Sequence, residues 1–273
     1  MSFEPRPGGA PPADPPDRDE LREHLVRTRT AGDVATRRES NLESIRRASE
    51  RDPEYLFGLQ PRGRWSFDDL FALMVERVGI RPDRRHRRGP DTIDPDRTVA
   101  RLDAMRARLA AAARGRQRVL VATGHPNGVH AVHAAIAAAL ERAGCELVRP
   151  ASGASLDWGE GPRAIDYLQG VAVVSEGGWA CHTHSPRPME AMLATLRGRG
   201  EPPPDLVVAD HGYAGAAGEA GVESVGFADC NDPALFLGEA EGSVLVTVPL
   251  DDGMPADVYA PVSGYLLAGL RPR

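Results

Sequence analysis

Histidines and aspartates gather at a few places in this 273-residue chain, in or just after loops that follow short apolar runs. Six of the eight histidines and three of the aspartates lie there, namely His125, His130, His133, His182, His184, His211, Asp210, Asp229 and Asp232. Imidazoles and carboxylates are common ligands of divalent metal ions, and helix N-termini that follow such loops bind anions. We therefore expect a metal site beside an anion site, with metal ligands among Asp210, His211, Asp229, Asp232 and His182.

The runs that precede these loops are rich in β-branched residues, which is typical of buried strands. Six such runs occur, at residues 118–122, 146–148, 170–174, 205–209, 223–227 and 243–248, and helical patterns separate most of them. This alternation predicts an α/β fold with a doubly wound, mostly parallel sheet. Ligands bind such sheets at the carboxyl ends of the strands, so the polar loops should share one edge.

The composition divides the chain into three segments, of which the last would form the sheet domain. Residues 1–18 contain six prolines and few apolar residues, which predicts a disordered head. Residues 19–90 show helical spacing of Leu21, Leu25, Val34, Leu42 and Ile45, and Ser66 with Asp69 resembles a capping box, so we expect an N-terminal helical cap. Residues 91–273 would then form the α/β catalytic domain.

Composition excludes several classes of protein. All 33 basic residues are arginines, so no mechanism that needs a lysine is open to the chain, including the Walker phosphate loop and pyridoxal phosphate chemistry. Three cysteines make no disulfide framework, and neither a signal peptide nor an apolar membrane span is apparent, so we expect a cytoplasmic protein without a membrane partner. The net charge of −6 argues against nucleic acid as a partner, and nothing speaks against a homo-oligomer.

One alternative to metal chemistry lies in the same loops. The stretch from Cys181 to Arg187 matches Cys-x5-Arg, the phosphate-binding loop of cysteine-dependent phosphatases, and it precedes a helical pattern. Pro186 removes a backbone donor from that loop, and the loop has no glycine. Two fixed residues also recur easily in an arginine-rich chain, so this pattern alone does not decide the mechanism.

Five segments resemble a bacterial, mainly actinobacterial, family of phosphatases. They are residues 27–42, 121–126, 182–186, 208–212 and 227–239, and the likeness extends over nearly all of residues 20–268. The resemblance implies a phosphatase, and it agrees with the metal and anion sites expected from the residues themselves.

Together these observations lead to the hypothesis of a metal-dependent phosphatase acting on a small-molecule phosphomonoester, either a sugar phosphate or a nucleotide. A divalent ion (Mn, Mg, Fe or Zn) would activate water and neutralise phosphoryl charge. The proposed catalytic residues are His125 or His184 as the acid and Asp229, whereas the phosphate would be held by Arg29, Arg37, Arg38 and Arg187. A solvated helix face explains the first three arginines equally well.

Two other functional classes stay open at this level. The strand followed by Thr123-Gly124-His125 and a helix is similar to D-glutamate cyclase-like domains, which implies a metal-dependent lyase or cyclase acting on a carboxylate substrate. A module that binds a phosphate ligand without catalysis is the third class. The α/β fold hosts all three, so the fold alone does not choose among them.

Overall fold

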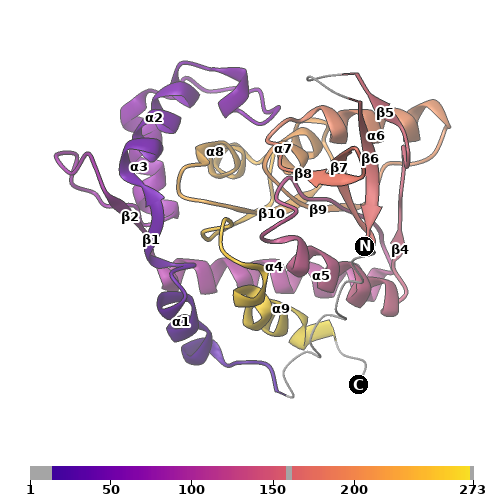
Figure 1. Ribbon diagram of the computed structural model, residues 1–273, viewed down its shortest axis with the longest axis horizontal. Coiled ribbons are helices and arrows are strands. Elements are labelled where there is room, and N and C mark those ends of the chain that lie inside the picture. Colours follow the sequence, from indigo (N-terminus) through magenta and orange to yellow (C-terminus); the bar gives the residue numbers. More distant parts are fainter. Residues whose placement is uncertain (1–13, 158–161, 271–273) are drawn as a thin grey trace.

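The computed structural model describes residues 14–157 and 162–270, and it folds the chain around a five-stranded sheet (Figure 1). The strands of this sheet are β3 (Arg118–Val121), β4 (Glu146–Leu147), β9 (Leu206–Asp210), β10 (Ser224–Ala228) and β11 (Val246–Pro249). They lie in the order β11-β10-β9-β3-β4, and every neighbouring pair is parallel. The expected α/β fold with a parallel sheet is confirmed.

Helices cover both faces of this sheet (Figure 1). One face carries α4 (Pro95–Gly115), α5 (His130–Arg142) and α9 (Ala260–Leu267). The other carries α7 (His211–Glu219) and α8 (Pro233–Glu241), with α6 (Arg187–Gly198) packed against α7. All residues of β9, β10 and β11 are buried, which explains why these strands are largely apolar instead of alternating with polar residues.

The order of the strands creates a crevice between β3 and β9. From β3 the chain first adds β4 on one side, and later adds β9, β10 and β11 on the other side. The loops that follow β3 and β9 lead to helices on opposite faces, so they separate at the carboxyl edge of the sheet, where ligands bind in folds of this order. His125 follows β3, and Asp210 ends β9. Two of the predicted site residues therefore lie at this crevice.

A second, antiparallel sheet contains β5 (Ser155–Leu156), β6 (Arg163–Leu168), β7 (Val171–Glu176) and β8 (Trp179–Cys181). Our assignment of residues 170–174 to the parallel sheet was wrong, because this run forms β7 and pairs antiparallel with β6 and β8. Its five residues from Val171 to Ser175 are all buried, so it has the unbroken apolar pattern of a central parallel strand. The two sheets touch where Ala122 pairs with Ala172, and β8 then leads directly to His182.

The N-terminal segment packs α1 (Arg18–Arg27), α2 (Arg38–Ser49) and α3 (Phe67–Arg77) against α4 and α8. Asp17 with Glu20, and Ser66 with Asp69, form capping boxes. Val34, expected in a helix, lies instead in β1 (Gly32–Arg37), which pairs with β2 (Pro90–Ile93) across the boundary that we placed at residue 90. Most of the head, residues 1–13, lies outside the described residues.

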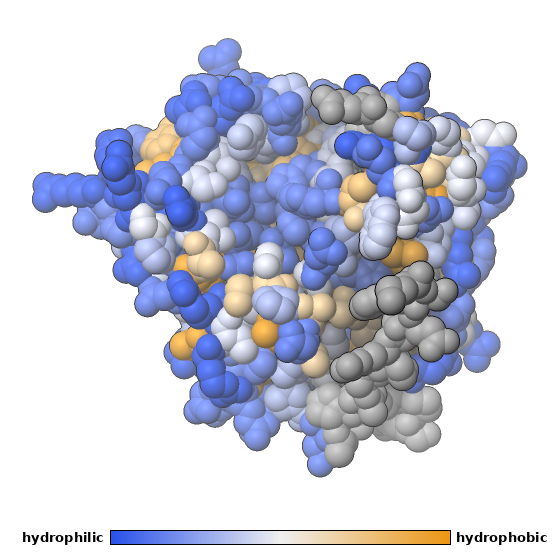
Figure 2. All heavy atoms as spheres, viewed as in Figure 1, coloured by the Kyte–Doolittle hydropathy of each residue, from blue (hydrophilic) through white to orange (hydrophobic). Residues whose placement is uncertain are grey.

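The remaining described elements are the short helices η1 (Pro53–Tyr55), η2 (Ala256–Tyr259) and η3 (Ala268–Leu270). No described helix combines the length and the apolar character needed to cross a bilayer. Figure 2 shows that the middle of the face seen in Figure 1 is strongly hydrophilic, between the N-terminal segment on one side and α5 and α7 on the other.

Candidate metal centre

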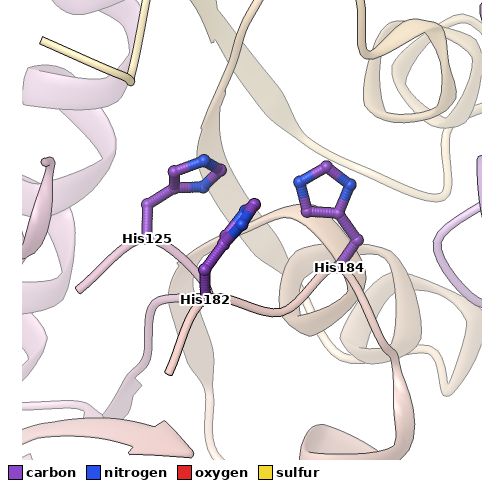
Figure 3. A group of neighbouring side chains, drawn as sticks. All are labelled: His125, His182 and His184. Atoms are coloured by element: carbon purple, nitrogen blue, oxygen red, sulfur yellow. The ribbon is translucent and has the colours of Figure 1, made fainter. Parts of the chain in front are cut away.

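Four histidine rings, from two loops and the start of a helix, face one another at the crevice. His125 comes from the loop after β3, His182 and His184 come from the loop between β8 and α6, and His211 is the first residue of α7. The ring centre of His125 lies 4.1 Å from that of His182 and 4.3 Å from that of His211. His184 stacks on His211 at 4.2 Å. Figure 3 shows His125, His182 and His184 gathering from their two loops.

Two glycines allow these loops to approach so closely. The amide of Thr183 donates a hydrogen bond of 3.0 Å to the carbonyl of Gly124, which ties the second loop to the first. A Cβ atom on Gly124 would overlap the carbonyl oxygen of Thr183, and one on Gly212 would lie 2.6 Å from the backbone nitrogen of Pro186. Any side chain at either position would push His184 and its neighbours away from the other rings.

Gly124→Ala should therefore damage both the fold and the site. We expect the free energy of unfolding to fall by about 1–3 kcal/mol, the usual cost of overpacking. Activity should fall by up to about 10²-fold, since displacements near 1 Å disturb the reacting geometry. Denaturant unfolding and kcat/KM measure the two effects. The matched control is Gly198→Ala, where an added Cβ meets nothing within 4 Å, and an equal loss in both variants would contradict this role of Gly124.

Five aspartates surround the histidines, and each is at most 5% exposed: Asp210, Asp229, Asp232, Asp251 and Asp252. His211 Nε2 lies 3.1 Å from Asp232 Oδ2 and 3.5 Å from Asp252 Oδ2. The other oxygen of Asp252, Oδ1, lies 3.7 Å from His125 Nε2. The histidines and the carboxylates thus form one continuous cluster.

Asp210 supports this cluster from behind. Its Oδ1 accepts a 2.6 Å hydrogen bond from the amide of Gly124, and its Oδ2 accepts one from the hydroxyl of Thr123. Its Oδ1 also lies 3.4 Å from His211 Nδ1. A carboxylate in this position orients the imidazole and fixes its tautomer. We predicted Asp210 to be a metal ligand, and in the structure its carboxylate contacts His211 and the first loop.

Burial and neighbouring charges shift the pKa values of these histidines in two opposite directions. Burial, assisted by the nearby His211, lowers the pKa of His125 to about 3 and that of His184 to about 4. Burial also acts to lower the pKa of His211, but Asp232, Asp210 and Asp252 together raise it well above its usual value. His125 and His184 are therefore neutral near pH 7, which is the form that binds metals and not the form that donates a proton.

Three of the five carboxyl groups, those of Asp229, Asp251 and Asp252, have raised pKa values, in contrast to the lowered values of His125 and His184. Burial, together with the charges of Asp251 and Asp232, raises the pKa of Asp229 to about 7. Burial raises the pKa of Asp252 well above its usual value, and Asp229 and Asp232 add to this effect. Crowded buried carboxylates cannot all ionise unless a cation compensates them.

The donor atoms suit a divalent cation. Three groups that contain histidine bring one atom from each residue within 4.8 Å of the others, and they are His125-His182-His184, His125-His211-Asp252 and His184-His211-Asp232. Within the described part of the chain, two buried atoms of the cluster, Nε2 of His184 and Oδ2 of Asp252, have no hydrogen-bond partner. Buried polar atoms are normally paired, so these two atoms are available to a ligand.

Sequence analysis missed Asp251, Asp252 and Thr36. Asp229 follows β10 directly, and only Leu250 separates the two aspartates from the end of β11, so the pattern that identified the other loops applies to them as well. Thr36 lies in β1 and its hydroxyl donates a hydrogen bond to Asp229 Oδ2. No local pattern connects Thr36 to this site, since 193 residues separate the two partners.

The four arginines expected to bind phosphate have different surroundings. Arg38 is fully buried and forms an ion pair with Asp91, so it is not available to a ligand. Arg29 donates hydrogen bonds to the carbonyls of Asp33 and Val34, and thereby braces β1. Arg37 and Arg187 are exposed, Arg37 next to Thr36 and Arg187 three residues after His184. Exposed arginines in these positions are available to a phosphate group.

The loop from Cys181 to Arg187 lacks the backbone donors that a cysteine phosphatase uses. The amides of Thr183, Ser185 and Arg187 already donate hydrogen bonds to Gly124, Thr183 and Ser185, respectively. Proline at position 186 has no amide hydrogen to offer. A cradle of amides around a phosphate is therefore not formed, which favours the metal alternative over the cysteine alternative.

Comparison with known proteins agrees with the resemblance seen in the sequence. Phosphatase SCO2771 of Streptomyces coelicolor (strain ATCC BAA-471 / A3(2) / M145) is 52% identical over 260 residues, which cover 94% of this chain and 98% of that protein. The model of the family described as Phosphatase matches residues 16–271. The site described above thus lies within the matched region, and the chain belongs to the Phosphatase family.

Proposed function

We propose that this phosphatase is a metal-dependent phosphomonoester hydrolase that acts on a small phosphate ester, such as a sugar phosphate or a nucleotide. One observation carries the proposal: imidazoles and buried carboxylates from separate strand ends form one cluster, and two of its buried atoms have no hydrogen-bond partner among the described residues. This donor set suits Zn, Fe or Mn better than Mg, because Mg prefers ligand sets made of oxygen.

The roles of the residues follow from their contacts. His125, His184, His211 and Asp232 would hold the cation, which would displace a proton from His211, and Asp210 with Thr123 would keep His211 in its orientation. A divalent cation in such a place activates water and neutralises charge on phosphoryl oxygens. Arg187 and Arg37 are our candidates for contact with the phosphate, because both are exposed close to residues of the cluster.

Release of inorganic phosphate from a panel of phosphomonoesters tests the proposal. We expect release that a chelator abolishes and that Mn²⁺ or Zn²⁺ restores. Release that persists in chelator but is lost in Cys181→Ser would replace the metal mechanism with the cysteine mechanism. If no ester is hydrolysed, the hypotheses for the site become metal-dependent conversion of a carboxylate substrate and binding of a phosphate ligand without catalysis.

Burial and the nearby His211 lower the pKa of His182 as well, but His182 is the most exposed of the four clustered histidines, and we assign it the role of protonating the departing oxygen. His182→Ala should then slow the hydrolysis of an alkyl phosphate by at least about 10²-fold, the usual contribution of a general acid. Hydrolysis of nitrophenyl phosphate should change much less, because nitrophenolate leaves without a proton. Equal losses of kcat/KM with the two esters would instead support our earlier prediction that His182 is a metal ligand.

A further inference from the structure

We propose a second cation site, formed by Asp229, Asp251 and Asp252, that takes a hard divalent cation such as Mg²⁺ or Mn²⁺. This inference rests on the proposed metal-dependent function and extends it, because the site adjoins the histidine cluster and shares Asp252 with it. The fold places the three residues together: Asp229 follows β10 and the other two follow β11, and the ends of these strands pair at Ala228 and Pro249.

The three carboxylates converge beside the ring of His211, which already pairs with Asp210 and Asp232 as well as with Asp252. One oxygen from each lies within 4.8 Å of the others, and the three residues are only 4–5% exposed. Such close burial of like charges is unfavourable unless a positive charge compensates them. A ligand set made of oxygen atoms favours Mg²⁺ or Mn²⁺, whereas the imidazoles next to it favour Zn²⁺, Fe²⁺ or Mn²⁺.

Asp252 provides an independent indication of a ligand site at these three carboxylates. Its Oδ2 is buried and has no hydrogen-bond partner among the described residues, although it lies 3.5 Å from His211 Nε2. Its Oδ1 lies 3.7 Å from His125 Nε2. Both oxygens of Asp252 therefore lie within 4 Å of an imidazole, and one of them is also within 4.8 Å of an oxygen of Asp229 and of Asp251, which is the position of a carboxylate shared between two cations.

The N-terminal segment holds the other two carboxylates in place. The hydroxyl of Thr36 and the amide of Cys230 donate to the two oxygens of Asp229, and the amides of Ala35 and Gly253 donate to those of Asp251. A carboxylate oxygen accepts more than one hydrogen bond or ligand, so each residue keeps a free lone pair. Strand β1 thus positions the second site, and Thr36 is a positioning residue.

Metal content tests the second site independently of activity. The full chain is stripped with chelator and dialysed against MnCl₂, and the bound manganese is then counted by mass spectrometry and examined by electron paramagnetic resonance. We expect two Mn²⁺ per chain with a spin-coupled spectrum in the wild type, and one with an uncoupled spectrum in Asp251→Asn. The control Asp68→Asn changes an exposed carboxylate on α3 and should keep two.

The possible outcomes separate this inference from the proposed function. A single Mn²⁺ in the wild type, or two in a folded Asp251→Asn protein, would overturn the second site but leave the first intact. No bound metal would overturn both. The ratio in Asp251→Asn is compared only after its circular dichroism and melting temperature match those of the wild type.

Thr36→Val provides a second test that does not alter a ligand. The loss of its hydroxyl should weaken binding of the second Mn²⁺ by about 10–100-fold, as is usual for groups that orient ligands, and should leave the first unchanged. Thr36→Ser keeps the hydroxyl and should restore wild-type binding. Titration calorimetry measures both affinities, and an unchanged second affinity in Thr36→Val would overturn the positioning role.

Discussion

Replacing His211 with asparagine should reduce kcat/KM for phosphate ester hydrolysis by about 10³-fold or more, which is equivalent to about 4 kcal/mol of transition-state stabilisation. His211 lies at the centre of the cluster, because its ring contacts His125 on one edge and Asp232 and Asp252 on the other. It belongs to two of the three groups of potential ligands that contain histidine. Its loss should therefore remove metal and activity together.

Asparagine is the informative substitution because of the backbone at this position. His211 has a φ of 42°, which lies in the left-handed region that few residues other than glycine adopt. Asparagine tolerates this conformation better than alanine does, so His211→Asn preserves the turn from β9 into α7 while it removes the imidazole. The loss of activity can then be assigned to the missing ring and not to a distorted loop.

Metal content and kcat/KM are measured on the same preparation of His211→Asn. The control is His86→Asn, which changes a histidine of the 81–89 segment whose ring nitrogen lies 3.2 Å from the carbonyl of Pro90. That variant should behave like the wild type. Wild-type hydrolysis by a folded His211→Asn protein would show that the cluster is not the catalytic centre.

Much of the site could be predicted from sequence because it depends on the ends of strands. His125, His211 and Asp229 each follow an apolar run, and parallel strands carry their loops to one edge. The same rule extends to Asp251 and Asp252, although we did not apply it there. The run at residues 170–174 was misplaced because a strand buried on both faces looks alike in parallel and antiparallel sheets.

Other features depend on partners that no local pattern reveals. Thr36 reaches Asp229 across 193 positions of the chain, and Arg38 reaches Asp91 across 53. An arginine next to other arginines in a sequence looks like part of a solvated or ligand-binding face. The burial of Arg38 depends on the tertiary fold, which places the Asp91 carboxylate beside it and excludes solvent from both.

Arg38 is expected to contribute to stability and not to phosphate binding. Its side chain is fully buried, and Nη1 donates a 2.7 Å hydrogen bond to Asp91 Oδ2. Nε and Nη2 donate to the carbonyls of His86 and Asp83. Arg38→Met should lower the free energy of unfolding by about 3–5 kcal/mol, because it leaves the buried Asp91 carboxylate without its cation.

Arg187 should contribute to phosphate binding and not to stability. Comparing its variant with that of Arg38 separates these two roles. Arg187 is exposed at the start of α6, so Arg187→Met should change the free energy of unfolding by no more than about 0.5 kcal/mol. It should raise the KM for a phosphate ester, whereas Arg38→Met should leave KM unchanged at temperatures where the variant is folded. Denaturant unfolding and steady-state kinetics of both variants decide the matter. A raised KM in a stable Arg38→Met protein would return Arg38 to the phosphate site and would require the Arg38–Asp91 pair to open when substrate binds.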